Sequence, residues 1–226
     1  RRLPRYMGDL CADLAALARI RVADSRPRLA VTAAEEEQCA GLRRRLGLGE
    51  EPYFLLNPGA AYGAAKLWPP ESMARTGSLL HRSRGWRGVV LSGPDPAEQE
   101  LARRVAEAGE GVAAAVGEEL VRLGPLKPLV RDAAFMLSTD SGPRHFAVAL
   151  GTPHVALLGP TDPRFTGRHL ERARVVRRPP PCSPCHLRTC VLGHHRCLRE
   201  ITPEMVLAAV AELGEEGLLP SAPPAP

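Results

Sequence analysis

Short apolar runs that alternate with helix-like segments constrain the fold of this chain more than any other feature. The runs lie between residues 53 and 176, and most are apolar over nearly their whole length. A strand with apolar residues at almost every position is covered on both faces, which is typical of parallel sheets. The alternation therefore predicts an α/β fold, a Rossmann-like parallel sheet with helices on both faces. The expected strands are Tyr53–Asn57, Gly88–Gly93, Val112–Val116, Phe135–Asp140, His154–Gly159 and Ala173–Val176.

Helices are also expected outside this alternation. Tyr6–Ile20 carries leucines at helical spacing, and Thr32 is placed to cap a helix over Ala33–Leu46. Thr202 is placed in the same way before a helix over residues 202–213. Between the strands, helices are expected from Pro69 onward and over residues 96–108, 126–133 and 143–151.

The chain is expected to divide into three parts. Residues 1–50 precede the first strand, and residues 51–212 contain the alternation, a cysteine-rich loop over 179–200 and the last helix. Residues 214–226 are rich in proline near their end and are expected to be a disordered tail.

Length and charge set further limits. The chain has 226 residues and a formal net charge of +5, which suits an anionic ligand or surface, although excess arginine also serves solubility. It has no stretch of roughly 20 apolar residues that could span a bilayer, and its first residues do not have the pattern of a signal peptide. Six cysteines in a chain of this size are compatible with a reducing compartment, and no nucleic-acid partner is expected.

Two glycines and a lysine follow the first expected strand. Gly59 and Gly63 allow the backbone to approach a ligand closely, and Lys66 supplies a positive charge for phosphate. The spacing differs from the GxxxxGK[ST] phosphate-binding loop, so this segment taken alone is better read as a connector.

The stretch TDSGPRHF follows another expected strand. Ser141 and Gly142 would present free backbone N–H groups at the start of the next helix, and His145 could reach the same anion. The plainer alternative is that Asp140 or Ser141 only caps the helix. Because Gly159–Asp162 ends a neighbouring strand, the sequence favours an anion site.

One acidic residue follows the second expected strand. The carboxylate of Glu98 could accept hydrogen bonds from ribose hydroxyls. Its position in the first turn of a helix, where negative charge is favourable, is by itself better explained by the helix dipole alone.

Three segments together resemble one family, the ADP-heptose:lipopolysaccharide heptosyltransferases of glycosyltransferase family 9. They are PGAAYGAAKLWPPESMA, STDSGPRHFAVALGTPHVALLGPTDP and CSPCHLRTCVLGHHRCLREITPEMV. The first segment is most similar to the members that add the second heptose, heptosyltransferase II. The resemblance implies a GT-B architecture of two Rossmann-like domains, of which this chain would be the C-terminal, donor-binding half, with residues 1–50 as interdomain linker and helices from the end of the N-terminal domain.

The resemblance also implies a set of donor-binding residues. Lys66 would contact the diphosphate of ADP-heptose, and Glu98 would lie near the ribose. Arg144 departs from the family's pattern and would add a charge beside the phosphates. The full set implied for the donor is Gly59, Ala60, Lys66, Glu98, Asp140, Ser141, Gly142, His145, Thr161 and Asp162.

The implied reaction is the transfer of heptose from ADP-heptose to the lipopolysaccharide inner core. Lys66, His145 and the helix that follows Asp140 would stabilise the departing ADP. The general base is expected in an N-terminal domain outside this chain, so no catalytic residue is assigned here, and the isolated chain is expected to bind donor without transferring sugar. No cofactor is expected, since the sequence lacks a metal-binding DxD motif. The enzyme would act in the cytoplasm, peripheral to the inner membrane, on a lipid acceptor bound by the other domain.

Four cysteines lie close together near the C-terminus. Their C-x2-C-x4-C-x6-C spacing is compatible with tetrahedral zinc but differs from that of paired zinc knuckles, so disulfides and free thiols remain open. The cluster consists of Cys182, Cys185, Cys190 and Cys197. The sequence is therefore also compatible with two other functions. One is a non-catalytic module that binds a nucleoside diphosphate, and the other is a metal or thiol module built on this cluster.

Overall fold

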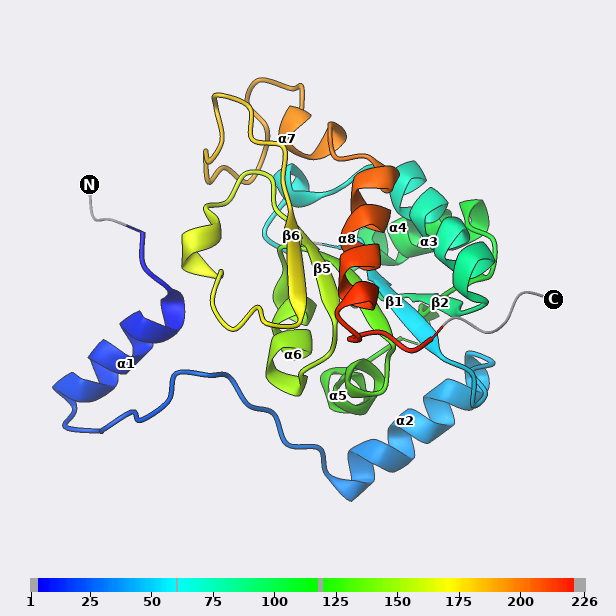
Figure 1. Ribbon diagram of the computed structural model, residues 1–226, viewed down its shortest axis with the longest axis horizontal. Coiled ribbons are helices and arrows are strands. Elements are labelled where there is room, and N and C mark those ends of the chain that lie inside the picture. Colours follow the sequence, from blue (N-terminus) through cyan, green and yellow to red (C-terminus); the bar gives the residue numbers. More distant parts are fainter. Residues whose placement is uncertain (1–3, 60, 118–119, 222–226) are drawn as a thin grey trace.

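The computed structural model of the protein describes residues 4–59, 61–117 and 120–221 and contains one sheet of six parallel strands (Figure 1). The strand order is β3-β2-β1-β4-β5-β6. The predicted α/β fold is confirmed, although four strands end earlier than expected because their last residues turn into the loops that follow. The strands are β1 Tyr53–Asn57, β2 Arg87–Val90, β3 Val112–Ala114, β4 Phe135–Thr139, β5 His154–Leu157 and β6 Ala173–Val176.

Helices cover both faces of the sheet. In the described chain they are α1 Met7–Leu17, α2 Ala33–Arg45, α3 Pro70–Arg84, α4 Pro96–Ala108, α5 Leu123–Arg131, α6 Gly142–Leu150, α7 Arg196–Arg199 and α8 Pro203–Glu215, with short 3₁₀ turns η1 Ala64–Lys66 and η3 Pro163–Phe165. Helices α3, α4 and α8 pack together on one face, and α2, α5 and α6 pack on the other. Figure 1 shows α8 beside β5 and β6, with α5 and α6 below.

The first strand shows why its sequence is apolar throughout. Phe54 and Leu56 point into the core under α3, α4 and α8, whereas Tyr53 and Leu55 point into the core under α2, α5 and α6. Successive side chains of a strand alternate between its two faces. A strand at the centre of a sheet that is covered on both sides therefore needs apolar residues at odd and even positions alike.

The expected helix caps are present. Thr32 and Glu35 form a reciprocal capping box at the start of α2, since each side chain accepts the backbone N–H of the other residue. The side chain of Thr202 accepts the N–H of Met205 at the start of α8. Caps of this kind contribute roughly 1 kcal/mol each, so these two helix starts are set locally by the sequence.

Helix α1 stands apart from the core. None of its residues, all of which the structure describes, is buried, and Leu14 and Leu17 expose 66% and 83% of their surface. The segment is held by an ion pair in which Arg168 reaches Asp9 at 2.5 Å. Figure 1 shows α1 and the linker that follows it lying along the outside of the domain.

The end of the chain is more ordered than predicted. Helix α8 continues to Glu215, and Leu219 is buried in the core beside it. The prediction of a disordered tail from residue 214 is therefore wrong for residues 214–219, because the apolar pair Leu218 and Leu219 packs against the domain. Residues 222–226 lie outside the described residues.

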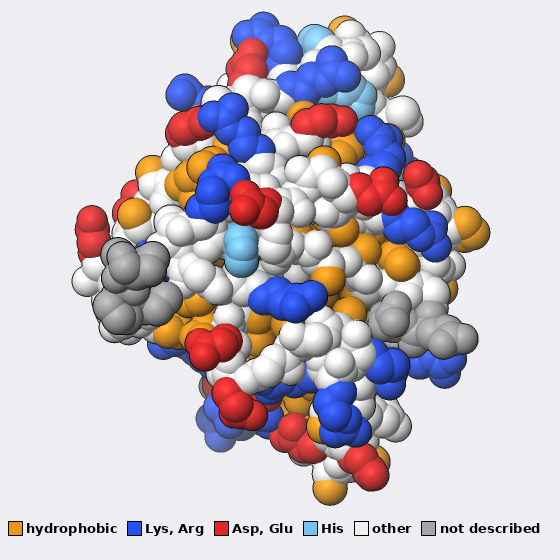
Figure 2. Space-filling model, turned by 90° about the vertical axis from the view of Figure 1, so that its right-hand side faces the viewer, with side chains coloured by type: hydrophobic (Ala, Val, Ile, Leu, Met, Phe, Trp, Pro, Cys, Tyr) orange, Lys and Arg blue, Asp and Glu red, His pale blue; other side chains and the backbone are white. Residues whose placement is uncertain are grey.

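No helix in the described part of the chain is both long and apolar enough to cross a membrane. Figure 2 shows one face of the molecule, on which Lys and Arg side chains are mixed with Asp and Glu rather than gathered into a single basic surface.

Candidate functional site

The order of the strands places the site between β1 and β4. These strands are neighbours in the sheet. From β1 the chain continues to β2 and β3 on one side, and from β4 it continues to β5 and β6 on the other side. Ligands of such sheets bind in the crevice beyond the carboxyl ends of the strands at this point. The two loops that leave β1 and β4 carry Gly59 and Lys66 on one side and Asp140, Ser141 and Gly142 on the other.

Asp140 is the centre of a buried polar cluster. The ammonium group of Lys66 donates to the carbonyl oxygen of Asp140 at 2.7 Å and to its carboxylate at 3.0 Å. Thr161 donates its hydroxyl to the same carboxylate oxygen at 2.6 Å, and Arg144 donates to the other oxygen at 2.6 Å. Both carboxylate oxygens accept these donors, so Asp140 positions its neighbours, and its own negative charge would repel an anion rather than bind one.

The charge of Asp140 is maintained by these neighbours. Burial acts to raise the pKa of this carboxyl, but the Thr161 hydroxyl and the Arg144 and Lys66 charges outweigh it, so the pKa lies below its ordinary value. The carboxylate therefore stays ionised at neutral pH. Lys66 has three N–H donors, and Asp140 takes two of them, which leaves one for a ligand.

Arg144 lies beneath the site. Its side chain is fully buried, and it binds Asp140 and both the hydroxyl and the carbonyl oxygen of Thr166, at 3.0 and 2.7 Å. The expectation that this residue adds a charge beside the phosphates is therefore wrong. The spacing from Asp140 is four residues, which directs the guanidinium back along α6 toward the carboxylate rather than outward.

The first turn of α6 is open to a ligand. Ser141 is the N-cap residue, but within the described chain it makes no side-chain capping hydrogen bond; its hydroxyl instead accepts the amide of Asn57 at 2.6 Å. Apart from its chain neighbours and the backbone of its own helix, no described atom lies within 4 Å of where a Cβ on Gly142 would be. Capping alone does not explain this stretch, and the free N–H groups with the helix dipole suit an anion.

A hollow of about 700 Å³ opens beside this turn. That volume lies in the range of small-molecule pockets. Glu98 lies on its rim and accepts the N–H of Gly93 at 3.0 Å. A Cβ at Gly59 would lie 3.2 Å from the Glu98 carboxylate, so a larger residue there would displace that side chain. The hollow thus combines one acidic rim residue, the open end of α6 and an apolar wall made of Leu91, Pro94, Val121, Leu123 and Leu126.

The predicted donor-binding residues form two adjacent groups instead of one. Gly59, Glu98, Ser141 and Gly142 line the hollow, whereas Lys66, Asp140 and Thr161 form the polar cluster at its edge. Ala60 lies outside the described residues.

His145 and Asp162 have separate surroundings. His145 lies in the first turn of α6; partial desolvation of its ring and the positive charge of Arg144 lower its pKa, so it is neutral at pH 7. Asp162 is bonded to the backbone and guanidinium of Arg164, which lowers its pKa to about 2. It shapes η3 and does not join the Asp140 cluster.

Sequence reasoning missed two polar residues of the site. Asn57 bridges Ser138 and Ser141, at 2.9 and 2.6 Å, across the β1–β4 junction. Thr139 donates its hydroxyl to the carbonyl oxygen of Gly59 at 2.8 Å and so fixes the glycine loop. The signal for both was their position, because each is the polar last residue of an otherwise largely apolar strand.

The four clustered cysteines lie between β6 and α8. Each is a free thiol, and Cys182 lies 3.9 Å from the Nε2 atom of His194. Across the described ranges, no group of three or more His, Cys, Asp or Glu side chains is arranged to hold a metal ion.

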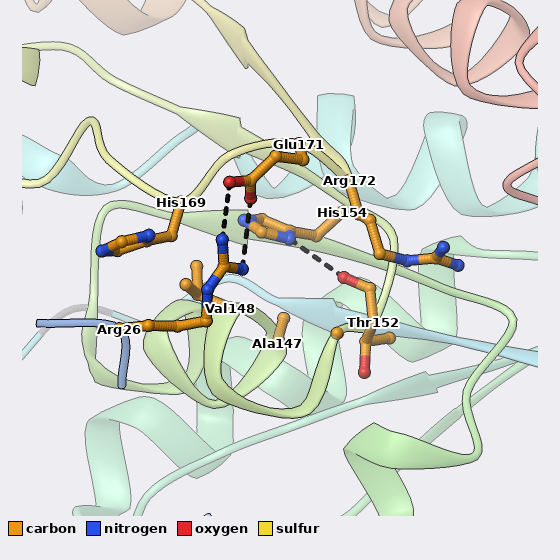
Figure 3. Close-up of a pocket in the computed structure, with 9 residues that line it drawn as sticks. Arg26, Ala147, Val148, Thr152, His154, His169, Glu171 and Arg172 are labelled. Atoms are coloured by element: carbon orange, nitrogen blue, oxygen red, sulfur yellow. Dashed lines mark hydrogen bonds and ion pairs between the residues drawn. The ribbon is translucent and has the colours of Figure 1, made fainter. Parts of the chain in front are cut away.

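A second, much smaller cavity, of about 30 Å³, lies at the amino end of β5. Arg26 of the linker forms an ion pair with Glu171 here, at 2.8 Å, and Figure 3 shows this pair beside the ring of His154. Burial lowers the pKa of His154 to about 4, and its Nδ1–H donates to the carbonyl oxygen of Thr152. This cavity is too small for a nucleotide and secures the linker.

The chain is similar to known proteins in both sequence and structure. The model of glycosyltransferase family 9 (heptosyltransferase) matches residues 13–196. Lipooligosaccharide heptosyltransferase 2 of Campylobacter jejuni is 31% identical over 164 residues, which are 70% of this chain and 50% of that protein. The chain therefore spans about half the length of this curated relative.

Two solved structures share the fold. A family 9 glycosyltransferase from Veillonella parvula aligns with a TM-score of 0.76 at 25% identity, over 96% of this chain and 62% of that one. E. coli ADP-heptose lipopolysaccharide heptosyltransferase II aligns with a TM-score of 0.67 at 27% identity, over 84% and 54%. These matches confirm the resemblance drawn from the three sequence segments, and the chain belongs to glycosyltransferase family 9, the heptosyltransferases.

Proposed function

We propose that this chain is the donor-binding domain of a heptosyltransferase and that it binds ADP-heptose at the β1–β4 junction. The observation that carries the proposal is the lysine held by Asp140 beside the uncapped first turn of α6. Two independent sources of positive potential thus meet at the edge of a hollow of about 700 Å³. The matched E. coli protein is named for ADP-heptose, which agrees in charge and size.

The hollow fits the nucleoside. Its apolar wall suits an adenine ring, and Glu98 at the rim suits the ribose hydroxyls, which donate to carboxylates. The diphosphate would then lie over Gly142, within reach of the third N–H of Lys66. His145, one turn further along α6, would gain a proton when the phosphates arrive.

The same groups serve the reaction. Breaking the bond between heptose and diphosphate leaves negative charge on the departing ADP, and donors fixed in advance lower the cost of that charge. Lys66 is fixed by Asp140, and Asp140 by Arg144 and Thr161. We propose that these residues stabilise the leaving group without a metal ion or other cofactor.

The acceptor is proposed to be the lipopolysaccharide inner core. A general base must remove the proton of the acceptor hydroxyl, and we place it on an N-terminal domain that would face this hollow. The full enzyme would work in the cytoplasm, with peripheral contact to the inner membrane. The isolated chain would bind donor and leave the sugar untransferred.

Calorimetric titration tests donor binding. ADP and ADP-heptose should bind to the chain with one site, adenosine should bind more weakly because it lacks the diphosphate, and inorganic phosphate should compete with ADP. Equal affinity for adenosine and ADP would contradict the diphosphate site. Transfer of heptose by this chain alone would contradict the placement of the general base.

A further inference from the structure

We infer that Arg188, in the cysteine-rich loop, is a positioning residue that holds the loop of Lys66 in its donor-binding conformation. The inference rests on the proposed function and adds a role for a segment to which that function gives none. Arg188 and Lys66 lie more than a hundred residues apart in sequence, yet the loop that carries Arg188 contacts the turn that carries Lys66 at several points.

The first contact is made by the backbone. The N–H of Ala65 donates to the carbonyl oxygen of Arg188 at 2.9 Å, directly before Lys66 in η1. Gly63 makes this approach possible, since a Cβ there would lie 2.5 Å from the same carbonyl oxygen, and its φ of +148° is a conformation that favours glycine. The glycine is therefore needed for contact with the cysteine-rich loop rather than with a ligand.

The second contact is made by the guanidinium. The Nε–H of Arg188 donates to the carbonyl oxygen of Tyr62 at 2.7 Å. The Cζ atom of Arg188 lies 5.7 Å from the centre of the Tyr62 ring, and the Nζ atom of Lys66 lies 4.7 Å from the same centre. Both cations thus meet one aromatic ring, an attraction of roughly 0.5–1 kcal/mol for each at a partly exposed site.

The third contact closes the arrangement from the other side. The Tyr62 hydroxyl donates to the carbonyl oxygen of His186 at 2.5 Å, two residues before Arg188. Tyr62 is therefore bonded to the cysteine-rich loop at both its backbone and its hydroxyl. Its ring can rotate away from Lys66 only if these bonds break.

These contacts matter because Lys66 lies on a short turn. A 3₁₀ turn of three residues has little rigidity of its own, so the direction of the lysine depends on what holds the turn. Asp140 fixes the ammonium group, and the cysteine-rich loop fixes the backbone and the ring beneath it. Loss of the second anchor would leave the lysine charge in place on average but would widen its range of positions.

A double-mutant cycle tests the role. Arg188→Ala should weaken ADP binding about tenfold in calorimetry and change adenosine binding by less than twofold, because only the diphosphate meets Lys66. In a Lys66→Met background, Arg188→Ala should weaken ADP binding by less than twofold. The matched control is Arg196→Ala, which removes an arginine of the same loop that pairs with Glu200 and should leave ADP binding unchanged.

Each result separates two explanations. Full additivity of the two substitutions would mean that Arg188 meets the phosphates directly, and equal weakening of ADP and adenosine would mean a general structural role; either overturns the inference. Unchanged ADP binding by Arg188→Ala would overturn it as well while the proposed function stands. Absence of ADP binding to the wild-type chain would defeat both. If Arg188→Ala unfolds, Arg188→Lys replaces it in the cycle, since lysine keeps the charge but lacks the planar Nε–H donor to Tyr62 and should weaken ADP binding to a similar degree.

Discussion

The guanidinium of Arg144 lies 2.6 Å from the carboxylate of Asp140, and the two side chains expose 0% and 7% of their surface. Two opposite charges are thus held in the interior directly below the first turn of α6. A buried pair of this kind contributes little net stability but becomes costly when one partner is removed. The pair fixes the Asp140 carboxylate to which Lys66 and Thr161 also bind, so it sets the geometry of the candidate donor site.

Removal of Asp140 should therefore destabilise the fold. Asp140→Ala leaves Arg144 buried without its counter-charge, and we expect the free energy of unfolding to fall by about 3–5 kcal/mol in urea denaturation. Adding Arg144→Met should recover part of that loss. The control is Asp13→Ala, which breaks an exposed pair with Arg5 and should change stability by less than about 1 kcal/mol. A loss below 1 kcal/mol for Asp140→Ala would contradict the buried pair.

Lys66 should act on the diphosphate alone. Lys66→Met should weaken ADP binding by about 10- to 100-fold, the size expected for one charged hydrogen bond, and leave adenosine binding within about twofold. Lys127 is the other lysine of the chain and is matched to it, being ion-paired with Glu35 at 2.6 Å and largely buried. Lys127→Met should not change ADP affinity. Equal losses from both substitutions would remove Lys66 from the site.

Glu98 should accept hydrogen bonds from the ribose hydroxyls. Glu98→Gln should weaken ADP binding by about 5- to 20-fold, because a hydrogen bond to a charged group is worth more than one to an amide. The loss should shrink when 2′,3′-dideoxy-ADP replaces ADP, since the hydroxyls that the carboxylate accepts are gone. Glu100→Gln is the control, because Glu100 is exposed and pairs only with Arg103 within the described chain. The same loss with both nucleotides would place the ribose elsewhere.

The fold and part of the site followed from the sequence for a clear reason. Apolar runs indicate which strands are covered on both faces. The strand order of such a sheet then places the ends of β1 and β4 next to each other. Lys66 and Asp140 could be grouped in advance because each lies in a loop at one of these ends. The positions of both loops are set by the order of the strands in the sheet more than by individual side-chain contacts.

The remaining features depend on where side chains point in three dimensions. Leu123 exposes 71% of its surface and lines the hollow, yet by sequence it cannot be told from a core leucine. Asp162 was grouped with the donor site, but its carboxylate is paired with the guanidinium of the nearby Arg164. The contact of Arg188 with Tyr62 joins two loops far apart in the chain, and no local pattern reports such a contact.

His145 should couple binding to pH. Its pKa lies below the ordinary 6.5 in the free chain, and nearby phosphates would raise it, so binding should take up a proton and tighten as pH falls through this range. Titration in two buffers of different ionisation enthalpy measures this uptake. His145→Gln should abolish the protein's share, while the share from the terminal phosphate of ADP, whose pKa is about 6, remains in both. The same proton count for wild type and variant would place His145 away from the phosphates.

The most direct measurement is a crystal structure of the chain soaked with ADP. The diphosphate is expected over Gly142, with the ammonium group of Lys66 within hydrogen-bonding distance of a phosphate oxygen and the adenine ring against the apolar wall that includes Leu126. ADP bound at another surface, with the ammonium group of Lys66 still shared only with Asp140, would contradict the assignment of the β1–β4 junction as the donor site.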